Sequence, residues 1–397
     1  MNEVRKILET YRKTDFNNQK AALATVIKVE GSSYRSPGAR MYLTDNGRWI
    51  GSISGGCLEG DAQRKSRQVI LDGLPQLVTY DTMDDDSNSL GVGLGCNGII
   101  HVLLEPITET SKSMQYLEKI AEFDDITGVA TVYKSSANTG IKSGDRLVID
   151  KNGHVQMGEG SSQLNELVHN DLFASLKEKK SYTRKYALKK SGYIEVFLEV
   201  FEPVIDLIVF GGGFDARPVV SFAQQLGWDV RVVDECVAHL FPANFPDAKI
   251  VSCDRSSVST NVNIKPFSAA VLMSHNLNYD YEVLNQLVKT DINYIGILGP
   301  QKRADKLYKK LKEGGHDPTS ADFRRIHSPV GLDIGADTPE EIALSIVAEI
   351  KARFTSRSGG LLKYRSGPIH DKDNKTGQVF KQVYLNEPFK DYKEKSS

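Results

Sequence analysis

Apolar and polar positions alternate in short runs over the first half of the chain, which is the pattern of half-buried β-strands. Segments with helical spacing of apolar residues lie between these runs, so the first half is predicted to be an α+β domain. The lysine-rich stretch 177–190 is interpreted as a solvated connection, with or without a strand. The predicted strands are 21–29, 39–43, 49–52, 99–104, 128–133, 146–149 and 193–200, and the predicted helices are 2–14, 58–71, 111–122 and 161–170.

The pattern changes from Pro203 onward, where short apolar runs are continuous instead of alternating. Such strands are buried on both faces, as in a parallel sheet covered by helices. The last predicted helix, 339–353, has Thr338 as its N-cap, Pro339 at its first position and Glu341 in a capping box. The apolar runs cover 205–210, 230–233, 249–251, 269–273 and 294–298.

These patterns predict an α/β protein. An N-terminal α+β domain is expected over 1–202, a C-terminal Rossmann-like doubly wound parallel sheet over 203–370, and a surface arm over 371–397. No internal repeat is evident in the sequence.

The amino-acid composition argues against several classes of function. The 50 basic and 51 acidic residues give a net charge of −1, which argues against nucleic acid as the main partner. No apolar run approaches the ~20 residues of a membrane span, and residues 1–8 are typical of an amphipathic helix, not a signal peptide. The four cysteines contain no CxxC pair, so a disulfide framework and a structural zinc site are not expected. We expect a cytoplasmic protein with free thiols.

A glycine-rich run directly follows the apolar strand 205–210 and fits the pattern G-x-G-x-x-G/A. Gly211 would allow a tight turn, Gly213 would let the backbone approach a pyrophosphate, and Ala216 would allow close packing of helix and strand. Asp234 ends the next strand, where an acid commonly binds ribose hydroxyls. The alternative is a doubly wound domain with an empty site. The run comprises Gly211, Gly212, Gly213, Phe214, Asp215 and Ala216.

Other candidates flank these elements. His275 follows the fourth apolar strand, at the edge where open α/β sheets bind ligands, and a satisfied loop histidine is the alternative. The segment 31–40 carries Arg35 and Arg40 among glycines and hydroxyls, which suits an oxyanion or phosphate. A turn-rich hairpin with exposed arginines explains the same segment equally well.

Two cysteines lie among glycines in the first half. Cys57 is placed at or beside the N-terminus of a predicted helix, where the helix dipole favours the thiolate as a nucleophile or soft-metal ligand. Cys96 lies in a similar setting directly before a strand, and the two thiols could converge. The alternative is that each is a small buried hydrophobic residue.

Together these segments resemble the XdhC/CoxF family, the accessory or maturation proteins of xanthine and carbon monoxide dehydrogenases. The resemblance covers most of the chain except about 107–190 and the C-terminal arm. One departure is Asn97, where many relatives carry glycine. The matching segments are 31–40, 51–60, 93–98, 211–218, 273–276, 295–300, 327–343 and 365–370.

The resemblance implies that the chain binds the molybdenum cofactor, as molybdopterin or its dinucleotide form. It implies that the chain keeps the cofactor while a cysteine desulfurase supplies sulfur, and then delivers it to an apo molybdenum hydroxylase of the xanthine dehydrogenase type. On this interpretation Cys57, with Cys96, contacts molybdenum or the incoming sulfur, and the glycine run with Arg35 and Arg40 holds phosphate. A homodimer is compatible with this role, and neither nucleic acid nor a membrane is expected as a partner.

An NAD(P)-dependent oxidoreductase is the runner-up, because the glycine run and Asp234 suit a nicotinamide dinucleotide. His275 or His327 would then handle the proton. The cysteine segments have no role in hydride transfer, so this hypothesis leaves them unexplained. A bridging protein with vestigial sites is a third interpretation. The sequence favours a cofactor-binding chaperone over a metabolic enzyme.

Overall fold

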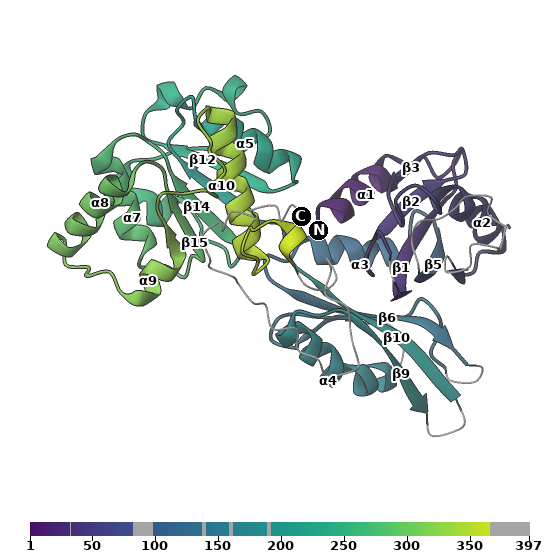
Figure 1. The fold of residues 1–397 in the computed structure, drawn as a ribbon. Coiled ribbons are helices and arrows are strands. Elements are labelled where there is room, and N and C mark those ends of the chain that lie inside the picture. Colours follow the sequence, from purple (N-terminus) through teal and green to yellow (C-terminus); the bar gives the residue numbers. More distant parts are fainter. Residues whose placement is uncertain (32, 82–97, 137–139, 159–161, 189–191, 366–397) are drawn as a thin grey trace, which may run out of the picture.

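Three β-sheets organise the part of the chain that the structure describes, two antiparallel in the first half and one parallel in the second (Figure 1). This confirms the expected α/β fold with an α+β first half and a Rossmann-like second half. A computed structural model describes residues 1–31, 33–81, 98–136, 140–158, 162–188 and 192–365.

The first antiparallel sheet, sheet A, has the strand order β3-β2-β1-β5-β4. Helix α1 precedes it in sequence, and α2 connects β3 to β4. The bounds are α1 (Asn2–Lys13), β1 (Ala21–Gly31), β2 (Arg40–Thr44), β3 (Trp49–Gly51), α2 (Glu59–Asp72), β4 (Gln76–Asp81) and β5 (Gly98–Ile107).

The second antiparallel sheet, sheet B, has the order β8-β7-β6-β10-β9. Its strands and helices follow one another in the same succession as those of sheet A. The bounds are α3 (Lys112–Ala121), β6 (Thr127–Ser135), β7 (Arg146–Ile149), β8 (Val155–Gly158), α4 (Ser162–Glu178), β9 (Tyr182–Leu188) and β10 (Gly192–Phe201).

The first half is therefore a duplicated module, and the expectation of no internal repeat is wrong. The register agrees with the order: Thr25 of β1 pairs with Arg40 of β2, and Thr131 of β6 pairs with Arg146 of β7. The same offset of 106 residues (131 − 25 and 146 − 40) relates both pairs. The sequence does not show the duplication, because the two copies share buried positions more than they share residue identities.

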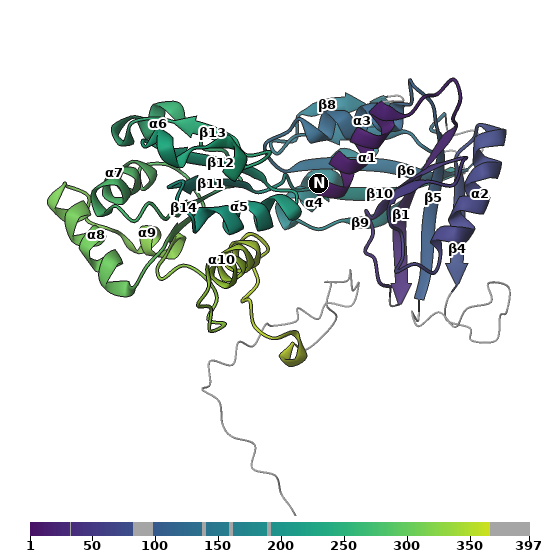
Figure 2. The ribbon, with the colours of Figure 1, turned by 90° about the horizontal axis from the view of Figure 1, so that it is seen from above.

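One hydrophobic core of the first half lies between the two sheets. Helix α1 buries Val4, Ile7, Leu8 and Tyr11, an i, i+3, i+4, i+7 stripe that packs with α3 against residues of both sheets. Helix α2 covers the other face of sheet A, and α4 covers the other face of sheet B. Sheet A and the parallel sheet lie at opposite ends of the molecule (Figure 2).

The parallel sheet, sheet C, has the order β13-β12-β11-β14-β15-β16, which is the Rossmann order. Helices α5 and α10 pack on one face, and α6, α7 and α8 pack on the other. The bounds are β11 (Asp206–Phe210), α5 (Ala216–Gln225), β12 (Asp229–Asp234), β13 (Lys249–Ser252), α6 (Val258–Asn261), β14 (Ser268–Leu272), α7 (Leu277–Leu287), β15 (Tyr294–Ile297), α8 (Gln301–Glu313), α9 (Ser320–Arg325), β16 (Ile326–His327) and α10 (Pro339–Phe354).

Several element boundaries differ from expectation. The stretch 177–190 is not a connection alone, because α4 continues to Glu178 and β9 follows. The pattern did not predict β4, β8 or β16, which are short, exposed on one side, or both. The start of α10 is as predicted, since Thr338 and Glu341 form the reciprocal capping box.

The two halves meet at the amino-terminal edge of sheet C. Arg5 of α1 forms a bidentate ion pair with Asp229, the first residue of β12, at 2.6 and 3.0 Å. Asn2 donates to the carbonyl of Leu226, and Lys265 pairs with Asp124 of the α3–β6 turn. This edge is therefore the one that faces sheets A and B, and the carboxyl-terminal edge lies on the far side of sheet C.

Candidate functional site

The glycine run forms the turn between β11 and α5. Gly211 has φ = +113°, and a Cβ there would lie 2.6 Å from the Cα of Ser274, so only glycine fits. Gly213 is different, because a Cβ added there would meet no atom within 4 Å. The backbone at Gly213 is therefore open to an approaching phosphate, as the sequence predicts for the second glycine of the motif.

His275 and Asp215 lie together beside this turn. His275 Nε2 is 3.1 Å from Asp215 Oδ2, and both side chains are accessible to solvent. They follow β14 and β11, the neighbouring strands where the sheet order reverses, which is where open α/β sheets bind ligands. Among the residues that the structure describes, none accepts a hydrogen bond from the N–H groups of Gly213 and Phe214. These groups can therefore donate to an anion.

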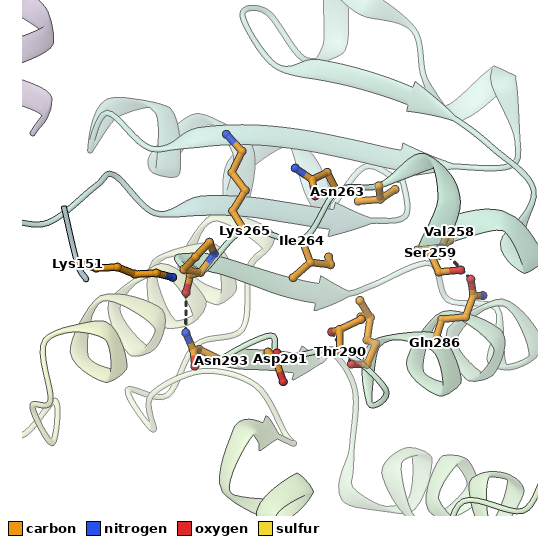
Figure 3. Close-up of a pocket in the computed structure, with 13 residues that line it drawn as sticks. Lys151, Val258, Ser259, Asn263, Ile264, Lys265, Gln286, Thr290, Asp291 and Asn293 are labelled. Carbon is orange, nitrogen blue, oxygen red and sulfur yellow. Dashed lines mark hydrogen bonds between the residues drawn. The ribbon is translucent and has the colours of Figure 1, made fainter. Parts of the chain in front are cut away.

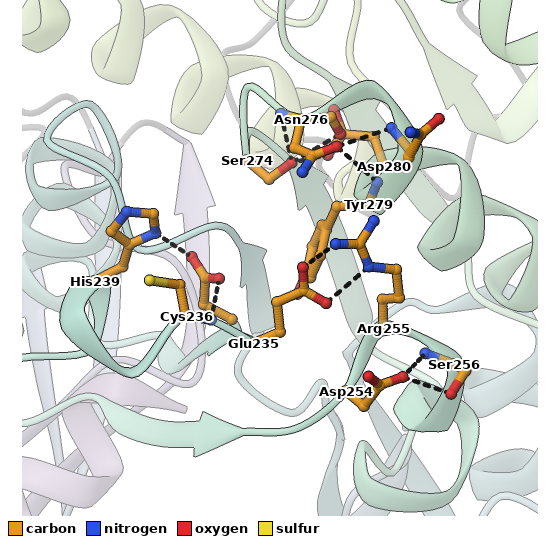
Figure 4. Close-up of polar contacts among 12 residues, drawn as sticks. Glu235, Cys236, His239, Asp254, Arg255, Ser256, Ser274, Asn276, Tyr279 and Asp280 are labelled. Carbon is orange, nitrogen blue, oxygen red and sulfur yellow. Dashed lines mark hydrogen bonds and ion pairs between the residues drawn. The ribbon is translucent and has the colours of Figure 1, made fainter.

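Asp234 is buried beneath the same turn, and both of its carboxylate oxygens have hydrogen-bond partners within the protein. One carboxylate oxygen accepts from Gly212 N at 2.8 Å and lies 3.0 Å from His239 Nδ1, and the other accepts from Cys236 N at 2.9 Å. His239 and Cys236 lie beside each other (Figure 4). A ribose would have to compete with these internal contacts, so Asp234 as observed supports the turn instead of offering a free acceptor.

Further charged contacts at this edge were not anticipated from the sequence. Asp280 is completely buried, accepts from Ser274 Oγ at 2.6 Å and forms an ion pair with Arg303 at 2.6 Å. Glu235 pairs with Arg255 (Figure 4). No sequence signal links these residues, because the partners come from separate segments that only the folded sheet brings together, with Asp280 in α7 and Arg303 in α8.

The cysteine loop precedes α2. Cys57 is exposed, and a Cβ added at Gly56 or at Gly60 would meet nothing within 4 Å, whereas one added at Gly55 would lie 3.3 Å from the ring of Tyr34. Gly56 has φ = +114°, a conformation that other residues rarely adopt. Cys96 lies outside the described residues, so its convergence with Cys57 stays a prediction.

The two arginines predicted to hold phosphate are engaged in ion pairs. Arg40 is buried and binds both carboxylate oxygens of Glu199, at 2.8 and 2.5 Å, which leaves no guanidinium face for a ligand. The anion-binding role predicted for Arg40 is therefore wrong for this fold. Arg35 is partly exposed and pairs with Glu3 at 2.7 Å, which ties the segment after β1 to the start of α1.

A cavity of about 630 Å³ lies at the amino-terminal edge of sheet C (Figure 3), and no residue of the glycine turn lines it. Its polar side chains are largely committed to the fold. Asn293 Nδ2 donates to the carbonyl of Pro266 at 2.6 Å, and Gln286 Oε1 accepts from Ser259 N at 2.9 Å. The cavity therefore does not add reactive groups to the glycine turn or to the cysteine loop.

His327 has a structural environment. Its Nδ1 lies 2.6 Å from Glu349 Oε1, and its ring stacks on Tyr294 at 4.4 Å between centroids. Tyr294 donates to Glu349, so one carboxylate of α10 holds both rings. Burial raises the pKa of Glu349, but hydrogen bonds from His327 and Gly331 outweigh it and leave the pKa lowered. This arrangement disfavours His327 as the proton donor of a dehydrogenase.

The described residues offer neither a clustered metal site nor a membrane span. They hold no group of three or more His, Cys, Asp or Glu placed to bind a metal ion. None of their helices is long and apolar enough to cross a membrane.

The geometry can be compared with known proteins. The family model described as the XdhC Rossmann domain matches residues 207–350, and the model of the XdhC and CoxI family matches residues 17–81. A Bacillus subtilis protein, named as one subunit of a probable xanthine dehydrogenase, is 33% identical over 344 residues, 84% of this chain and 93% of the relative. The chain belongs to the XdhC and CoxI family.

Two further relatives extend this result. A xanthine dehydrogenase of Bacillus halodurans, known from a crystal structure, is 31% identical with a TM-score of 0.70, covering 90% of this chain and 97% of that one. The molybdenum cofactor insertion chaperone PaoD of Escherichia coli is 22% identical over 330 residues, 83% of this chain and 82% of the relative. In this XdhC-type chain, the XdhC and CoxI match includes Cys57 but ends before Cys96, and the Rossmann match covers the glycine turn.

Proposed function

We propose that this protein is an accessory maturation factor for a molybdenum hydroxylase of the xanthine dehydrogenase type. It binds the molybdenum cofactor as cargo, holds it while it is sulfurated, and delivers it to the apoenzyme. The observation that carries this proposal is an exposed thiol, Cys57, next to the open Gly56, in a chain whose parallel sheet also has an open glycine turn. The names of the relatives point in the same direction.

The donor chemistry fits this cargo. Molybdenum and sulfide are soft partners for thiolate, and Cys57 is the accessible thiol of the first half among the described residues. The cofactor also carries phosphate, in molybdopterin and in its dinucleotide form alike. The N–H groups at Gly213 and the start of α5 suit that phosphate. Cys96 is the proposed second thiol, and Arg35 is a candidate for a further anion contact.

The proposal includes three associations. A cysteine desulfurase supplies the sulfur, the apo-hydroxylase receives the cofactor, and a second copy of the chain forms a homodimer. We place these steps in the cytoplasm, with neither nucleic acid nor a membrane as a partner. Light scattering of the purified chain measures the oligomeric state, and co-purification with each protein tests the other two associations.

The thiol is tested by Cys57→Ala, with Cys236→Ala as the matched control, because both thiols are exposed in the described structure. We expect Cys57→Ala to lose copurified molybdenum or activation of the apo-hydroxylase, while Cys236→Ala keeps both. Molybdenum is measured by metal analysis, pterin by absorbance, and sulfuration by hydroxylase activity. Full molybdenum content and full activation with Cys57→Ala would contradict the proposal.

An NAD(P)-dependent oxidoreductase remains the second candidate, favoured by the Rossmann strand order and the His275–Asp215 pair. The internal hydrogen bonds of Asp234 weigh against it. Titration with NADH, followed by nicotinamide fluorescence, separates the two functions. Saturable NADH binding without pterin or molybdenum in the purified protein would favour the oxidoreductase.

A further inference from the structure

The loop that carries Cys57 is organised from below by a buried carboxylate. Glu59, in the first turn of α2, is only 5% exposed. Its carboxylate accepts hydrogen bonds from Ser52 Oγ at 2.8 Å, Ser54 N at 2.9 Å and Ile53 N at 3.2 Å, and also from the Ser54 hydroxyl. Glu59 therefore accepts from the N–H groups of Ile53 and Ser54 and from the Ser54 hydroxyl, and it shares the single proton of the Ser52 hydroxyl with the carbonyl of Ser54.

The charge of Glu59 determines the direction in which the Ser54 hydroxyl donates its hydrogen bond. Two backbone N–H groups and two hydroxyls converge on the side chain of Glu59, so both of its oxygens act as acceptors, as in a carboxylate. A carboxylate can only accept, so the hydroxyl proton of Ser54 must point toward Glu59. The lone pairs of Ser54 Oγ are then left for other donors.

Those lone pairs bind the backbone on both sides of the cysteine. Ser54 Oγ accepts from Gly56 N at 3.2 Å and from Leu58 N at 3.0 Å. The residues before and after Cys57 are thus attached to the same hydroxyl, which is itself attached to Glu59. This chain of contacts fixes the backbone of Cys57 while leaving its thiol exposed.

The two copies of the duplicated module can be compared at the positions of Cys57 and Glu59. The offset of 106 residues that relates Arg40 to Arg146 also relates the buried residues Leu58 and Ala62 to Leu164 and Val168 (164 − 58 and 168 − 62). By the same offset, Cys57 corresponds to Gln163 and Glu59 to Asn165 in the sequence. The copy without the cysteine therefore also lacks the acid.

We propose that Glu59 is a positioning residue that acts through Ser54 to hold Cys57 in the geometry its reaction needs. This inference rests on the proposed function of Cys57, and it assigns to Glu59 no contact with the cargo. The carboxylate maintains the loop, and the loop presents the thiol.

The first test is the rate at which Cys57 is alkylated by iodoacetamide in the full chain, resolved from the other cysteines by peptide mass spectrometry. We expect Glu59→Gln to change this rate several-fold, because it loses the charge that orients Ser54. Asp61→Asn is the matched control: Asp61 is a buried acid of the same helical turn, but it pairs with Arg64 and Lys65, not with the loop. It should alkylate at the wild-type rate.

Ser54→Ala provides a second route, since it breaks the link and keeps the charge. We expect it to raise both the alkylation rate of Cys57 and hydrogen exchange of the amides at positions 56 and 58. If Glu59→Gln fails to fold, Ser54→Ala still decides the question. Wild-type alkylation and exchange in Ser54→Ala would overturn the proposal, and so would an equal effect of Glu59→Gln and Asp61→Asn, which would indicate only a general charge effect.

Molybdenum content of the same variants separates this inference from the proposed function. Alkylation requires no cofactor, so it reports the loop alone. A changed alkylation rate in Glu59→Gln with unchanged molybdenum content would overturn the claim that cargo binding needs this loop geometry, whereas the role of Cys57 itself is decided by Cys57→Ala. An unchanged alkylation rate in both variants contradicts the positioning role even where Cys57→Ala loses molybdenum.

Discussion

Arg40 and Glu199 form a buried bidentate ion pair between the two antiparallel sheets, although they are 159 residues apart in sequence. Their side chains are 7% and 6% exposed. The duplicated module repeats the contact in reverse, since Arg146 of sheet B pairs with Glu105 of sheet A at 2.5 Å. Each sheet thus supplies one buried cation and one buried anion to the other.

Removing one partner should therefore destabilise the first half strongly. We expect Glu199→Gln to lower the free energy of unfolding by about 3–5 kcal/mol, because it leaves a buried guanidinium without its counter-charge. Urea denaturation followed by tryptophan fluorescence measures the change, since Trp49 lies in sheet A. As control, Asp229→Asn breaks the more exposed pair with Arg5 and should cost only ~0–1 kcal/mol. Equal effects of the two variants would refute the distinction.

The two outer glycines of the motif should respond differently to alanine. Gly211→Ala places a Cβ against the backbone of Ser274 at a positive φ, so we expect it to destabilise the second half. Gly213→Ala meets no protein atom and should change the free energy of unfolding by less than ~0.5 kcal/mol. It should nevertheless weaken binding of a phosphate-bearing ligand, because the methyl group occupies the approach. Undiminished pterin content in Gly213→Ala would argue against a phosphate at this turn.

A substitution at His275 distinguishes a role in ligand binding from a role in the loop backbone. Its φ of +60° is unusual for a residue with a side chain, and glycine adopts it at no steric cost. We expect His275→Gly to leave the thermal midpoint unchanged or higher, while it removes the contact with Asp215 and reduces ligand content. A lower midpoint with normal ligand content would instead make His275 a structural loop residue.

The pH dependence of stability should reveal the carboxylate under the cysteine loop. Because the folded-state pKa of Glu59 lies below its ordinary value of 4.5, its contribution is fully present above that pH and is lost as the pH falls through the folded-state pKa. Glu59→Gln lacks the contribution at every pH. We expect a stability difference of about 1–3 kcal/mol between wild type and Glu59→Gln at neutral pH, which shrinks on acidification below 4.5. A difference that stays constant with pH would show that the charge is irrelevant.

The sequence predicted the parallel sheet well because its strands are buried on both faces and read as continuous apolar runs. The sequence also predicts the start of α10, since Thr338 and Glu341 contact each other within one helical turn. These signals are local. The glycine turn is local too, and Gly211 and Gly213 take the positions that the motif assigns to them.

Local sequence patterns do not predict contacts between segments that are distant in the sequence. Arg40 lies in a segment whose composition suits an anion, but its partner Glu199 comes from the last strand of sheet B. Likewise, the predicted ribose acid Asp234 is engaged by His239, whose orientation depends on the folded loop after β12. The sequence places Glu59 two residues from Cys57, but it does not predict that the side chain of Glu59 is buried beneath the loop.

The contact between the halves also has a consequence for how partners assemble. Arg5 and Asp229 place sheets A and B at the amino-terminal edge of sheet C, whereas the glycine turn opens at the other edge. The five residues of β11 separate the two edges by roughly 16 Å. A protein seated over the glycine turn therefore leaves the contact between the halves undisturbed. Binding there does not require the two halves to separate, and the chain can keep one internal arrangement through successive encounters.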